Sequence, residues 1–276
     1  MSYYLIKRVK VFLIYIKTFR EIPIGRNKHK LSWQMQKLKI NKHKPLDYIL
    51  CDKYLVRDFI KLKLGNEFLI PLLGAYDSIK QINFDSLDYP VVIKNSHSSG
   101  GVLILREQSD IDHDKLMILE KSLNKNYFKI SNEEQYKHIK PRIIIEKCIL
   151  KENKLPDDFK FHCFNGEVLF VYCSIDREGS NYRKVYNKFW EPIELTWSRK
   201  NQESKFDGKH IEKPNNLHKM IKVAEYLANR SKYCRIDLYS IDNNIYFGEY
   251  THYHGGGLEF IKPEKYNHLF GACLLD

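Results

Sequence analysis

The most regular pattern in the chain is a pair of strand-like segments close to the C-terminus. Residues 233–239 and 245–251 are rich in β-branched and aromatic side chains, which favour strands. The residues between them, Asp242-Asn243-Asn244, are turn-forming. The two segments are therefore expected to form an antiparallel hairpin.

Similar patterns upstream predict a chain of mixed helices and strands. Asn165-Gly166 between two alternating runs is a strong hairpin signal, and Asp52 and Gly65 mark the two ends of a predicted helix. Strands are expected at residues 71–76, 89–94, 102–105, 141–150, 157–164 and 168–173, and helices at 52–64 and through Leu116, Leu119 and Leu123.

The first twenty residues have a different pattern. On a helical wheel of about 100° per residue, Lys7, Lys10, Lys17 and Arg20 share one sector, and apolar side chains fill much of the rest. The longest charge-free run after Lys7, residues 11–16, is far shorter than the ~20 apolar residues of a spanning helix. The segment is expected either to lie on an anionic membrane or to pack on the domain with a solvated basic side.

Charge is concentrated in the same region. The formal net charge is +12, but residues 1–44 hold twelve Lys or Arg and one acidic residue, which leaves +1 for residues 45–276. A nucleic-acid-binding protein would carry basic stripes across its fold, so no nucleic-acid partner is expected. Residues 24–44, with Gly25 and many charges between Pro23 and Pro45, are expected to form an exposed linker. Six cysteines without C-x-x-C spacing, and no cleavable signal pattern, indicate reduced, mostly buried thiols in a cytoplasmic protein.

Candidate chemistry begins in the C-terminal hairpin. Pairing across its turn would bring Asp237 and Glu249 together on one face, which Arg235 shares because strand side chains repeat every two residues. Two close carboxylates repel each other unless a cation lies between them, and an oxygen site of this kind suits Mg²⁺ with bound phosphates. The glycines at 255–257 allow a close backbone approach to a ligand. His252 and His254 beside them are either candidates for a general base or structural histidines.

A second candidate site lies at the end of the predicted strand 89–94. Lys94 precedes the small-residue loop 95–101, whose backbone N–H groups can bind phosphate oxygens. The loop lacks the order of a P-loop, and alone it is also consistent with a hairpin turn. Farther on, the strand 141–150 stops being apolar at Glu146-Lys147, which indicates either a polar ligand or an edge-strand ion pair.

An acidic run at residues 109–114 has two interpretations. Asp110-Ile111-Asp112 and Asp112-His113-Asp114 match the D-x-D pattern by which many glycosyltransferases bind a metal and a nucleotide sugar. The helical pattern that follows directly favours a capping role instead. A hydrolase is disfavoured because the chain has no G-x-S-x-G elbow.

Taken in order, these motifs resemble those of the TupA-like ATP-grasp family, the type of teichuronopeptide and surface-polysaccharide biosynthesis. The resemblance covers about Pro45 to Asp276, and its motifs are weak singly and fairly specific together. They are Asp52-Lys53-Tyr54 with Val56-Arg57, Leu69 to Gly74, Lys94 with the loop to Gly101, Glu146-Lys147, Asp158-Phe159-Lys160-Phe161 with Asn165-Gly166, Arg235 to Tyr239, Tyr246 to Glu249, and the final glycines with Phe260 and Pro263.

The resemblance implies an α+β ATP-grasp fold, in which two α+β subdomains clasp ATP and a basic helical arm precedes them. The implied divisions are residues 1–44 for the arm and linker, 45–145 for the subdomain with the phosphate loop, and 146–276 for the subdomain with the metal site.

The resemblance also implies roles for individual residues. Arg235 would stabilise the tetrahedral oxyanion, and Lys94 would take part in catalysis as well as in phosphate binding. Many ATP-grasp ligases have Asn two residues after the metal Glu, whereas this chain has Thr251, so a hydroxyl or a water would replace that ligand. The implied nucleotide-binding residues are Lys53, Lys94, Ser98, Ser99, Gly100, Gly101, Glu146, Lys147, Ile149, Asp158 and Lys160, and the implied Mg²⁺ ligands are Asp237, Glu249 and Thr251.

The implied activity is that of an ATP-dependent carboxylate–amine ligase acting through an acyl-phosphate. Its acceptor would be a uronic acid of a bacterial surface polysaccharide or a lipid-linked glycan, and its second substrate an amino acid or another amine. A glycosyltransferase of polysaccharide biosynthesis is the alternative. If residues 1–44 bind anionic lipid, the protein would lie at the inner face of the cytoplasmic membrane.

Overall fold

The computed structural model describes residues 3–41, 43–98, 101–125, 127–200, 210–229 and 231–275. The chain divides into two compact units. The terminal unit contains residues 1–42 and 154–276, and the middle unit contains residues 43–153. This grouping differs from the divisions drawn from the sequence, because residues 1–42 pack with the C-terminal segment and the change of unit comes after Asn153.

The middle unit is built on a four-stranded antiparallel sheet in the order β1-β4-β2-β3. Apolar side chains of the sheet pack with Leu116 and Leu119 into its core. The four strands predicted here are confirmed, although the last is shorter than expected. The strands are β1 (Leu72–Tyr76), β2 (Val91–Asn95), β3 (Val102–Leu105) and β4 (Ile143–Lys147). The helices are α3 (Pro45–Cys51), α4 (Val56–Leu64), α5 (His113–Leu123) and α6 (Tyr127–Ser131).

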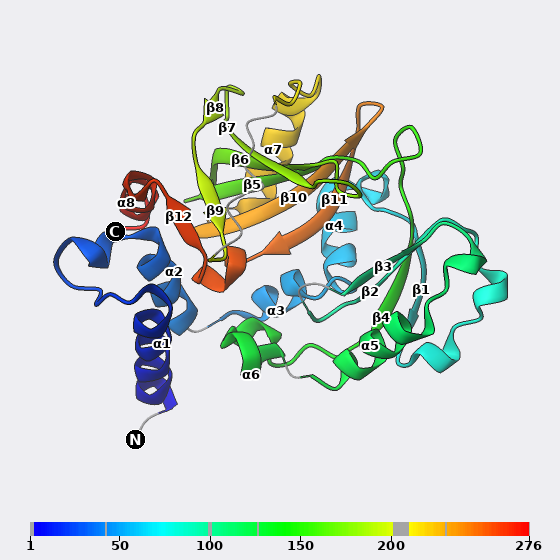
Figure 1. The fold of residues 1–276 in the computed structure, drawn as a ribbon, viewed down its shortest axis with the longest axis horizontal. Helices are drawn as coiled ribbons and strands as arrows, with labels where there is room; N and C mark the ends of the chain where they lie inside the picture. Colours follow the sequence, from blue (N-terminus) through cyan, green and yellow to red (C-terminus); the bar gives the residue numbers. More distant parts are fainter. Residues whose placement is uncertain are drawn as a thin grey trace. The chain divides into compact units, whose positions relative to one another are not determined.

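The terminal unit contains a six-stranded antiparallel sheet in the order β11-β10-β5-β6-β7-β8, with α7 packed along β5, β6 and β10 (Figure 1). The strands of this sheet are β5 (Asp158–Phe164), β6 (Glu167–Ile175), β7 (Tyr182–Asn187), β8 (Pro192–Ile193), β10 (Tyr233–Ile241) and β11 (Asn244–Thr251). A small second sheet pairs β9 (Thr196–Ser198) with β12 (Phe260–Lys262). The helices are α1 (Tyr3–Phe19), α2 (Leu31–Ile40), α7 (Leu217–Ala228) and α8 (Glu264–Ala272).

The expectation of an exposed linker at residues 24–44 is wrong. Ten of these residues form α2, which packs against α8 in the terminal unit (Figure 1). Its Leu31 and Met35 are fully buried in the same apolar core as Trp197 and Phe270. The many lysines of the segment concealed this short apolar face, because a buried helix side needs only one apolar residue per turn.

The predicted C-terminal hairpin is confirmed, and its register contains one irregularity. Asp237 pairs with Glu249, but the next pair is Leu238 with Phe247, so Gly248 is an extra residue in a β-bulge. A Cβ atom at Gly248 would lie 3.2 Å from the carbonyl oxygen of Asp237, which is tighter than most such contacts. Glycine therefore allows the bulge that keeps the two carboxylates opposite each other.

The six cysteines agree with the prediction of mostly buried thiols. All six are free, and five are buried, with Cys273 half-buried. Cys163 and Cys234 face each other across β5 and β10. Burial raises the pKa of the Cys173 thiol well above its ordinary value, so it stays protonated. These side chains act as small apolar residues of the core.

Candidate functional site

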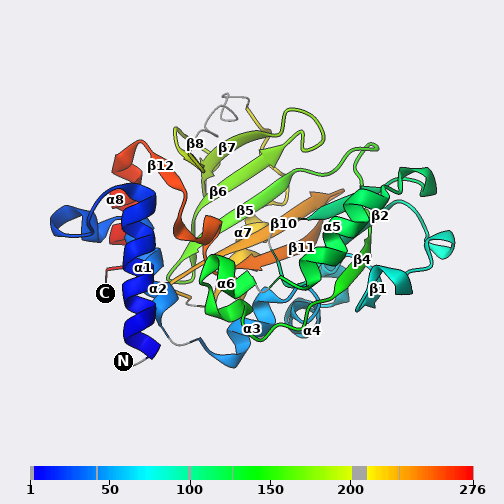
Figure 2. The same cartoon turned by 60° about the horizontal axis from the view of Figure 1, so that its bottom comes forward.

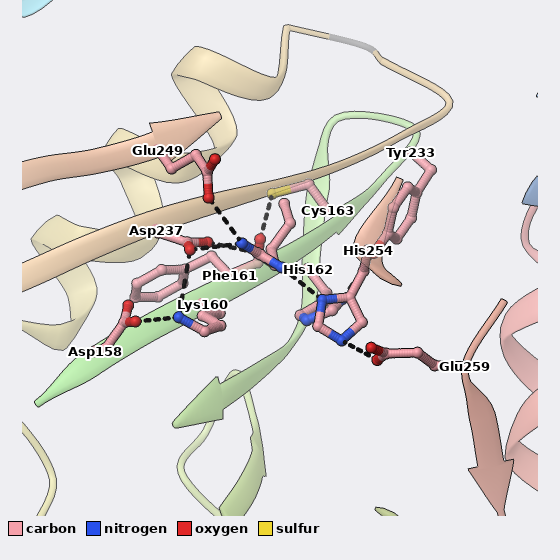
Figure 3. Close-up of polar contacts among 11 residues, drawn as sticks. Asp158, Lys160, Phe161, His162, Cys163, Tyr233, Asp237, Glu249, His254 and Glu259 are labelled. Carbon is pink, nitrogen blue, oxygen red and sulfur yellow. Dashed lines mark hydrogen bonds and ion pairs between the residues drawn. The ribbon is translucent and has the colours of Figure 1, made fainter. Parts of the chain in front are cut away.

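A cluster of charged side chains lies on one face of β5, β10 and β11 in the terminal unit (Figure 3). We call it the carboxylate cluster, and its members are Asp158, Lys160, Arg235, Asp237 and Glu249. Asp237 pairs with Glu249 on β11 and with Lys160 on β5. The sequence predicted the first of these pairs, and the antiparallel pairing of β5 with β10 adds Lys160 and Asp158 to the same place.

Arg235 lies between the two carboxylates that were predicted to bind a metal. Its Nε and Nη2 donate to the two oxygens of Asp237 at 2.6 and 2.8 Å, and Nη2 also donates to Glu249 at 3.2 Å. Burial alone would lower the pKa of Arg235, but the charges of Asp237 and Glu249 raise it above its ordinary value. The guanidinium therefore stays charged and relieves the repulsion between the two carboxylates.

Lys160 connects Asp158 to this cluster. Its Nζ forms an ion pair with Asp158 and lies 3.4 Å from Oδ2 of Asp237. Burial alone would raise the pKa of Asp158, but Lys160 and Arg177 hold it below its ordinary value. The other oxygen of this ionised carboxylate, Oδ1, is buried and has no hydrogen-bond partner among the described residues. An acceptor in this state has the capacity to bind a ligand donor or a cation.

Thr251 has a similar unused oxygen. Its Oγ1 is buried and forms no hydrogen bond with any described residue. Thr251 stands opposite Arg235 and two residues after Glu249, so all three side chains point to the same face of the hairpin. The hydroxyl is therefore suitably placed as a third oxygen ligand beside the carboxylates.

Two residues behind Arg235 have a role that the sequence did not predict. Nη1 of Arg235 lies 2.6 Å from Nδ1 of His254, and Nε2 of His254 lies 3.2 Å from Oε2 of Glu259 (Figure 3). A guanidinium can only donate, so Nδ1 accepts and the imidazole proton is on Nε2, facing Glu259. Burial lowers the pKa of His254, which keeps the ring neutral. Burial alone would raise the pKa of Glu259, but the contact with His254 holds it below its ordinary value.

This arrangement favours the structural interpretation of His254 over the general base. Its Nδ1 is held by Arg235, and its Nε2, which makes no hydrogen bond to the described residues, lies 3.2 Å from Glu259 inside the protein. The series Glu259, His254, Arg235 and Asp237 instead fixes the orientation of the guanidinium. No spacing in the sequence links Glu259 to Arg235, so this series becomes visible only in the folded chain.

The glycine run carries His254 and is held by α2. Gly255, Gly256 and Gly257 have φ of 56°, 63° and 67°, in the left-handed region that favours glycine. The carbonyl oxygens of Gly256 and Gly257 accept from Nε2 of Gln36 at 3.0 and 2.8 Å. Nζ of Lys39 donates to Gly256 at 2.8 Å. Among the described contacts, the groups that come close to the glycine backbone are the side chains of Gln36 and Lys39 on α2.

A second charged cluster lies in the middle unit, on α4, β2 and β4. We call Arg57, Lys94 and Glu146 the cation cluster. Oε1 of Glu146 accepts from Nη1 of Arg57 at 2.8 Å, and Oε2 lies 2.5 Å from Nζ of Lys94. The side chains of Arg57 and Lys94 are each 14% exposed, against 7% for Glu146. The predicted residues Lys94 and Glu146 are therefore brought together, and Arg57 joins them as a second cation.

Other predicted nucleotide-binding residues lie nearby in the same unit. Nζ of Lys53 donates to the carbonyl oxygen of Ser98 at 2.8 Å, at the loop that follows Lys94. Gly101 has φ of 68°, again in the left-handed region. Ser99 and Gly100, the middle of the predicted phosphate lid, lie outside the described residues.

The remaining predicted residues are distributed differently. Lys147 follows Glu146 in β4 and therefore points to the opposite face, where its Nζ binds Asp88 at 2.6 Å. Ile149 lies just after β4 and is half-buried. Asp158 and Lys160, which were grouped with the nucleotide-binding set, belong to the carboxylate cluster of the terminal unit.

The acidic run at 109–114 caps turns and a helix, as the capping interpretation predicted. Asp112 precedes α5, and its Oδ1 accepts from the backbone N–H of Lys115 at 3.1 Å. Oδ2 of Asp110 accepts from the backbone N–H groups of Arg106 and Glu107 at 2.7 and 3.1 Å. Backbone hydrogen bonds thus engage both aspartates of the first D-x-D pattern, and Asp112 is shared with the second.

The model of one protein family, described as TupA-like ATP-grasp, matches residues 29–275. The chain belongs to this family. Its α+β fold is therefore the ATP-grasp fold, as the order of motifs predicted. The family match begins before Pro45 and includes α2, in agreement with the burial of that helix in the terminal unit.

This chain is similar in structure to solved ligases at low sequence identity. D-alanine–D-alanine ligase from Bacillus anthracis, solved with ATP, is 18% identical with a TM-score of 0.41, and the match covers 74% of this chain and 54% of that one. L-amino acid ligase from Bacillus licheniformis is 14% identical with a TM-score of 0.48, covering 91% of this chain and 56% of that one. The chain thus spans little more than half the length of these ligases. No curated protein matches the sequence.

The two clusters fit the groups that the family implies. Mg²⁺ prefers hard oxygen ligands and is commonly held by one or two carboxylates, with phosphates and water completing its shell. Asp237, Glu249 and the unpaired hydroxyl of Thr251 supply such oxygens. Within the described ranges, no group of three or more His, Cys, Asp and Glu side chains is arranged to hold a metal by itself. Lys94 and Lys53, the two lysines that the resemblance assigns to phosphate oxygens, both lie in the middle unit, where they contact Glu146 and the carbonyl oxygen of Ser98.

Proposed function

We propose that the protein is an ATP-dependent ligase that joins a carboxylate to an amine through an acyl-phosphate. The observation that supports this most is the register of the hairpin, which aligns Arg235 and Asp237 with Thr251 and Glu249 on one face. Those are the positions for which the family resemblance implies an oxyanion contact and a metal site. The cation cluster of the middle unit supplies charges of the opposite sign.

The proposed reaction has two bond-forming steps. The carboxylate oxygen attacks the γ-phosphorus of ATP and ADP leaves; the amine nitrogen then attacks the acyl carbon, and phosphate leaves as the amine loses a proton. ATP supplies the phosphoryl group, and Mg²⁺ bound by Asp237, Glu249 and Thr251 would neutralise charge on it. Lys94 adds positive charge for the phosphate oxygens.

Arg235 is the residue proposed to donate to the oxyanion that develops during amine attack. Asp237 and His254 hold its guanidinium in place, so little reorganisation is needed as charge develops. Because His254 is buried and its Nδ1 is held by Arg235, we propose that the amine proton passes to solvent rather than to this ring.

For the substrates, we propose a uronic acid of a surface polysaccharide or of a lipid-linked glycan, and an amino acid as the amine. This part of the proposal is supported by the resemblance to a family of surface-polysaccharide biosynthesis. A uronic acid presents the carboxylate that the chemistry requires, whereas a neutral sugar does not.

The experiment supplies ATP, Mg²⁺, uronic-acid oligosaccharides and a mixture of amino acids, and measures nucleotide products and new amides by mass spectrometry. ADP and phosphate are expected, with an amide that appears only when both substrates are present. AMP and pyrophosphate would contradict an acyl-phosphate. Consumption of a nucleotide sugar with ATP unused would instead support the glycosyltransferase alternative.

A further inference from the structure

Helix α1 presents an unusual outward face. Its side chains Leu5, Ile6, Val9 and Leu13 are 48%, 48%, 46% and 58% exposed. Ile6, Val9 and Leu13 line a groove along the helix together with Lys10 and Lys17. Large apolar residues that gather on one helix face differ from the single exposed apolar residues found on every protein surface.

The opposite side of α1 fixes which face points outward. Val11 and Tyr15 are buried, and Lys7 is buried on the same stripe, one turn before Val11. The ring of Tyr15 packs 5.1 Å from that of Trp33 on α2, and its hydroxyl donates to Glu21 at 2.5 Å. The helix therefore cannot turn its apolar groove inward without breaking this packing. Lys7 belongs to the packed side, and not to the basic sector that the helical wheel predicted.

The charge of α1 has a single sign. The helix carries Lys7, Arg8, Lys10 and Lys17 and no acidic residue. Helix α5 of the middle unit is a useful contrast, since it also exposes two large apolar residues, Met117 and Ile118, but balances its lysines with Asp114 and Glu120. Exposed apolar residues flanked by lysines, without acidic neighbours, suit a partner surface that has an apolar interior beneath a negatively charged outer layer.

We propose that the outward face of α1 docks on a membrane leaflet rich in anionic lipid. The apolar side chains would enter the boundary between headgroups and acyl chains, while Lys10 and Lys17 extend their ammonium groups to the lipid phosphates. Figures 1 and 2 show α1 at the periphery of the terminal unit. In the described part of the chain, no helix is long and apolar enough to cross a bilayer, so the contact is peripheral. This proposal does not depend on the ligase activity.

The test is co-sedimentation of the full chain with vesicles of phosphatidylglycerol and phosphatidylcholine, compared with phosphatidylcholine alone, at low and at high salt. Binding is expected only with the anionic vesicles, and it should weaken with salt because exposed charges are screened. Val9→Ser with Leu13→Ser, and separately Lys10→Glu with Lys17→Glu, should each reduce partitioning by about tenfold or more. Tryptophan emission reports whether α1 remains packed, since Phe12 and Tyr15 contact Trp33.

Matched controls come from α5. Met117→Ser with Ile118→Ser, and Lys115→Glu with Lys121→Glu, change the same chemistry on another exposed helix and should leave vesicle binding unchanged. The proposal is overturned if the wild-type chain ignores anionic vesicles at low salt, or if the α5 variants lose as much binding as the α1 variants. Loss with the charge variant alone would also overturn it, because apolar insertion would then be absent.

Discussion

The carboxylate cluster of the terminal unit and the cation cluster of the middle unit have the same design with opposite charges. In the first, Arg235 bridges two carboxylates, those of Asp237 and Glu249. In the second, Glu146 bridges two cations, those of Arg57 and Lys94. Each central ion relieves repulsion between its neighbours and leaves one charge in excess: a negative charge in the first bridge and a positive charge in the second.

The difference in the sign of the excess charge suggests a different ligand for each cluster. An excess of carboxylate suits a divalent cation, and an excess of ammonium and guanidinium suits phosphate oxygens. The clusters also differ in the number of contacts to the central ion. Arg235 contacts both oxygens of Asp237, one of Glu249 and Nδ1 of His254, whereas Glu146 contacts one nitrogen each of Arg57 and Lys94. Removal of a central ion should therefore cost more in the carboxylate cluster.

The largest effect is expected from Arg235→Ala. It would leave Asp237 and Glu249 facing each other without the guanidinium, and removal of one partner from a buried ion pair costs about 3–5 kcal/mol of stability. Tryptophan fluorescence during urea unfolding is the measurement, because all three tryptophans, at positions 33, 190 and 197, lie in the terminal unit. Arg235→Lys is the matched control and should recover part of the lost stability, since lysine keeps the positive charge but lacks the paired N–H donors of the guanidinium. A fall of less than about 1 kcal/mol in the alanine variant would contradict the bridging role.

A smaller loss, of about 2 kcal/mol, is expected from Glu146→Gln, because hydrogen bonds to charged groups contribute about that much and both cations retain some solvent contact. Hydrogen exchange of β2 and β4 peptides measures this in the middle unit, which contains no tryptophan. Tryptophan-detected unfolding should be unchanged in this variant. If the tryptophan-detected unfolding transition shifts as much in Glu146→Gln as in Arg235→Ala, the two clusters do not stabilise separate units.

Substitution of one flanking ion in each cluster should show which cluster binds phosphate and which binds the metal. Lys94→Met is expected to weaken ATP binding by about tenfold, or ~1.4 kcal/mol, whether or not Mg²⁺ is present. Glu249→Gln should leave metal-free ATP binding intact and remove most of the gain that Mg²⁺ provides. Isothermal titration with and without Mg²⁺ measures both. The same Mg²⁺ response in the two variants would contradict the division of roles.

The last prediction concerns pH, and the size of its effect grows as the pH is lowered. Burial lowers the pKa of His254 and holds that of His162 well below its ordinary value, so both rings are neutral when folded and take up protons more readily when unfolded. Stability of the terminal unit should therefore be full above about pH 6.5 and fall as the pH decreases below it, by about 1.4 kcal/mol for each unit by which a pKa is lowered. Urea midpoints between pH 7.5 and 5.5 measure this decline. His162→Gln should flatten it, and a midpoint that stays constant in the wild type would show that neither ring titrates differently on unfolding.

The sequence by itself determined the strands and the pairing that carries the candidate site. The turn near residues 242–244 and the two-residue period predict a hairpin that brings Asp237 and Glu249 together on one face, whereas the observed strands place them opposite each other only through the bulge at Gly248. The order of motifs then identified the family, and the helix-capping role of Asp112 followed from its position before a periodic apolar run.

Only the tertiary structure decided what surrounds these residues. The burial of α2, its hydrogen bonds from Gln36 and Lys39 to the glycine turn, and the contact of Glu259 with His254 join segments with no common period or spacing. The bulge at Gly248 and the inward stripe of α1 likewise depend on which neighbour each residue meets. Local sequence sets backbone conformation and the alternation of faces, but the partner of a side chain is chosen by packing between distant segments.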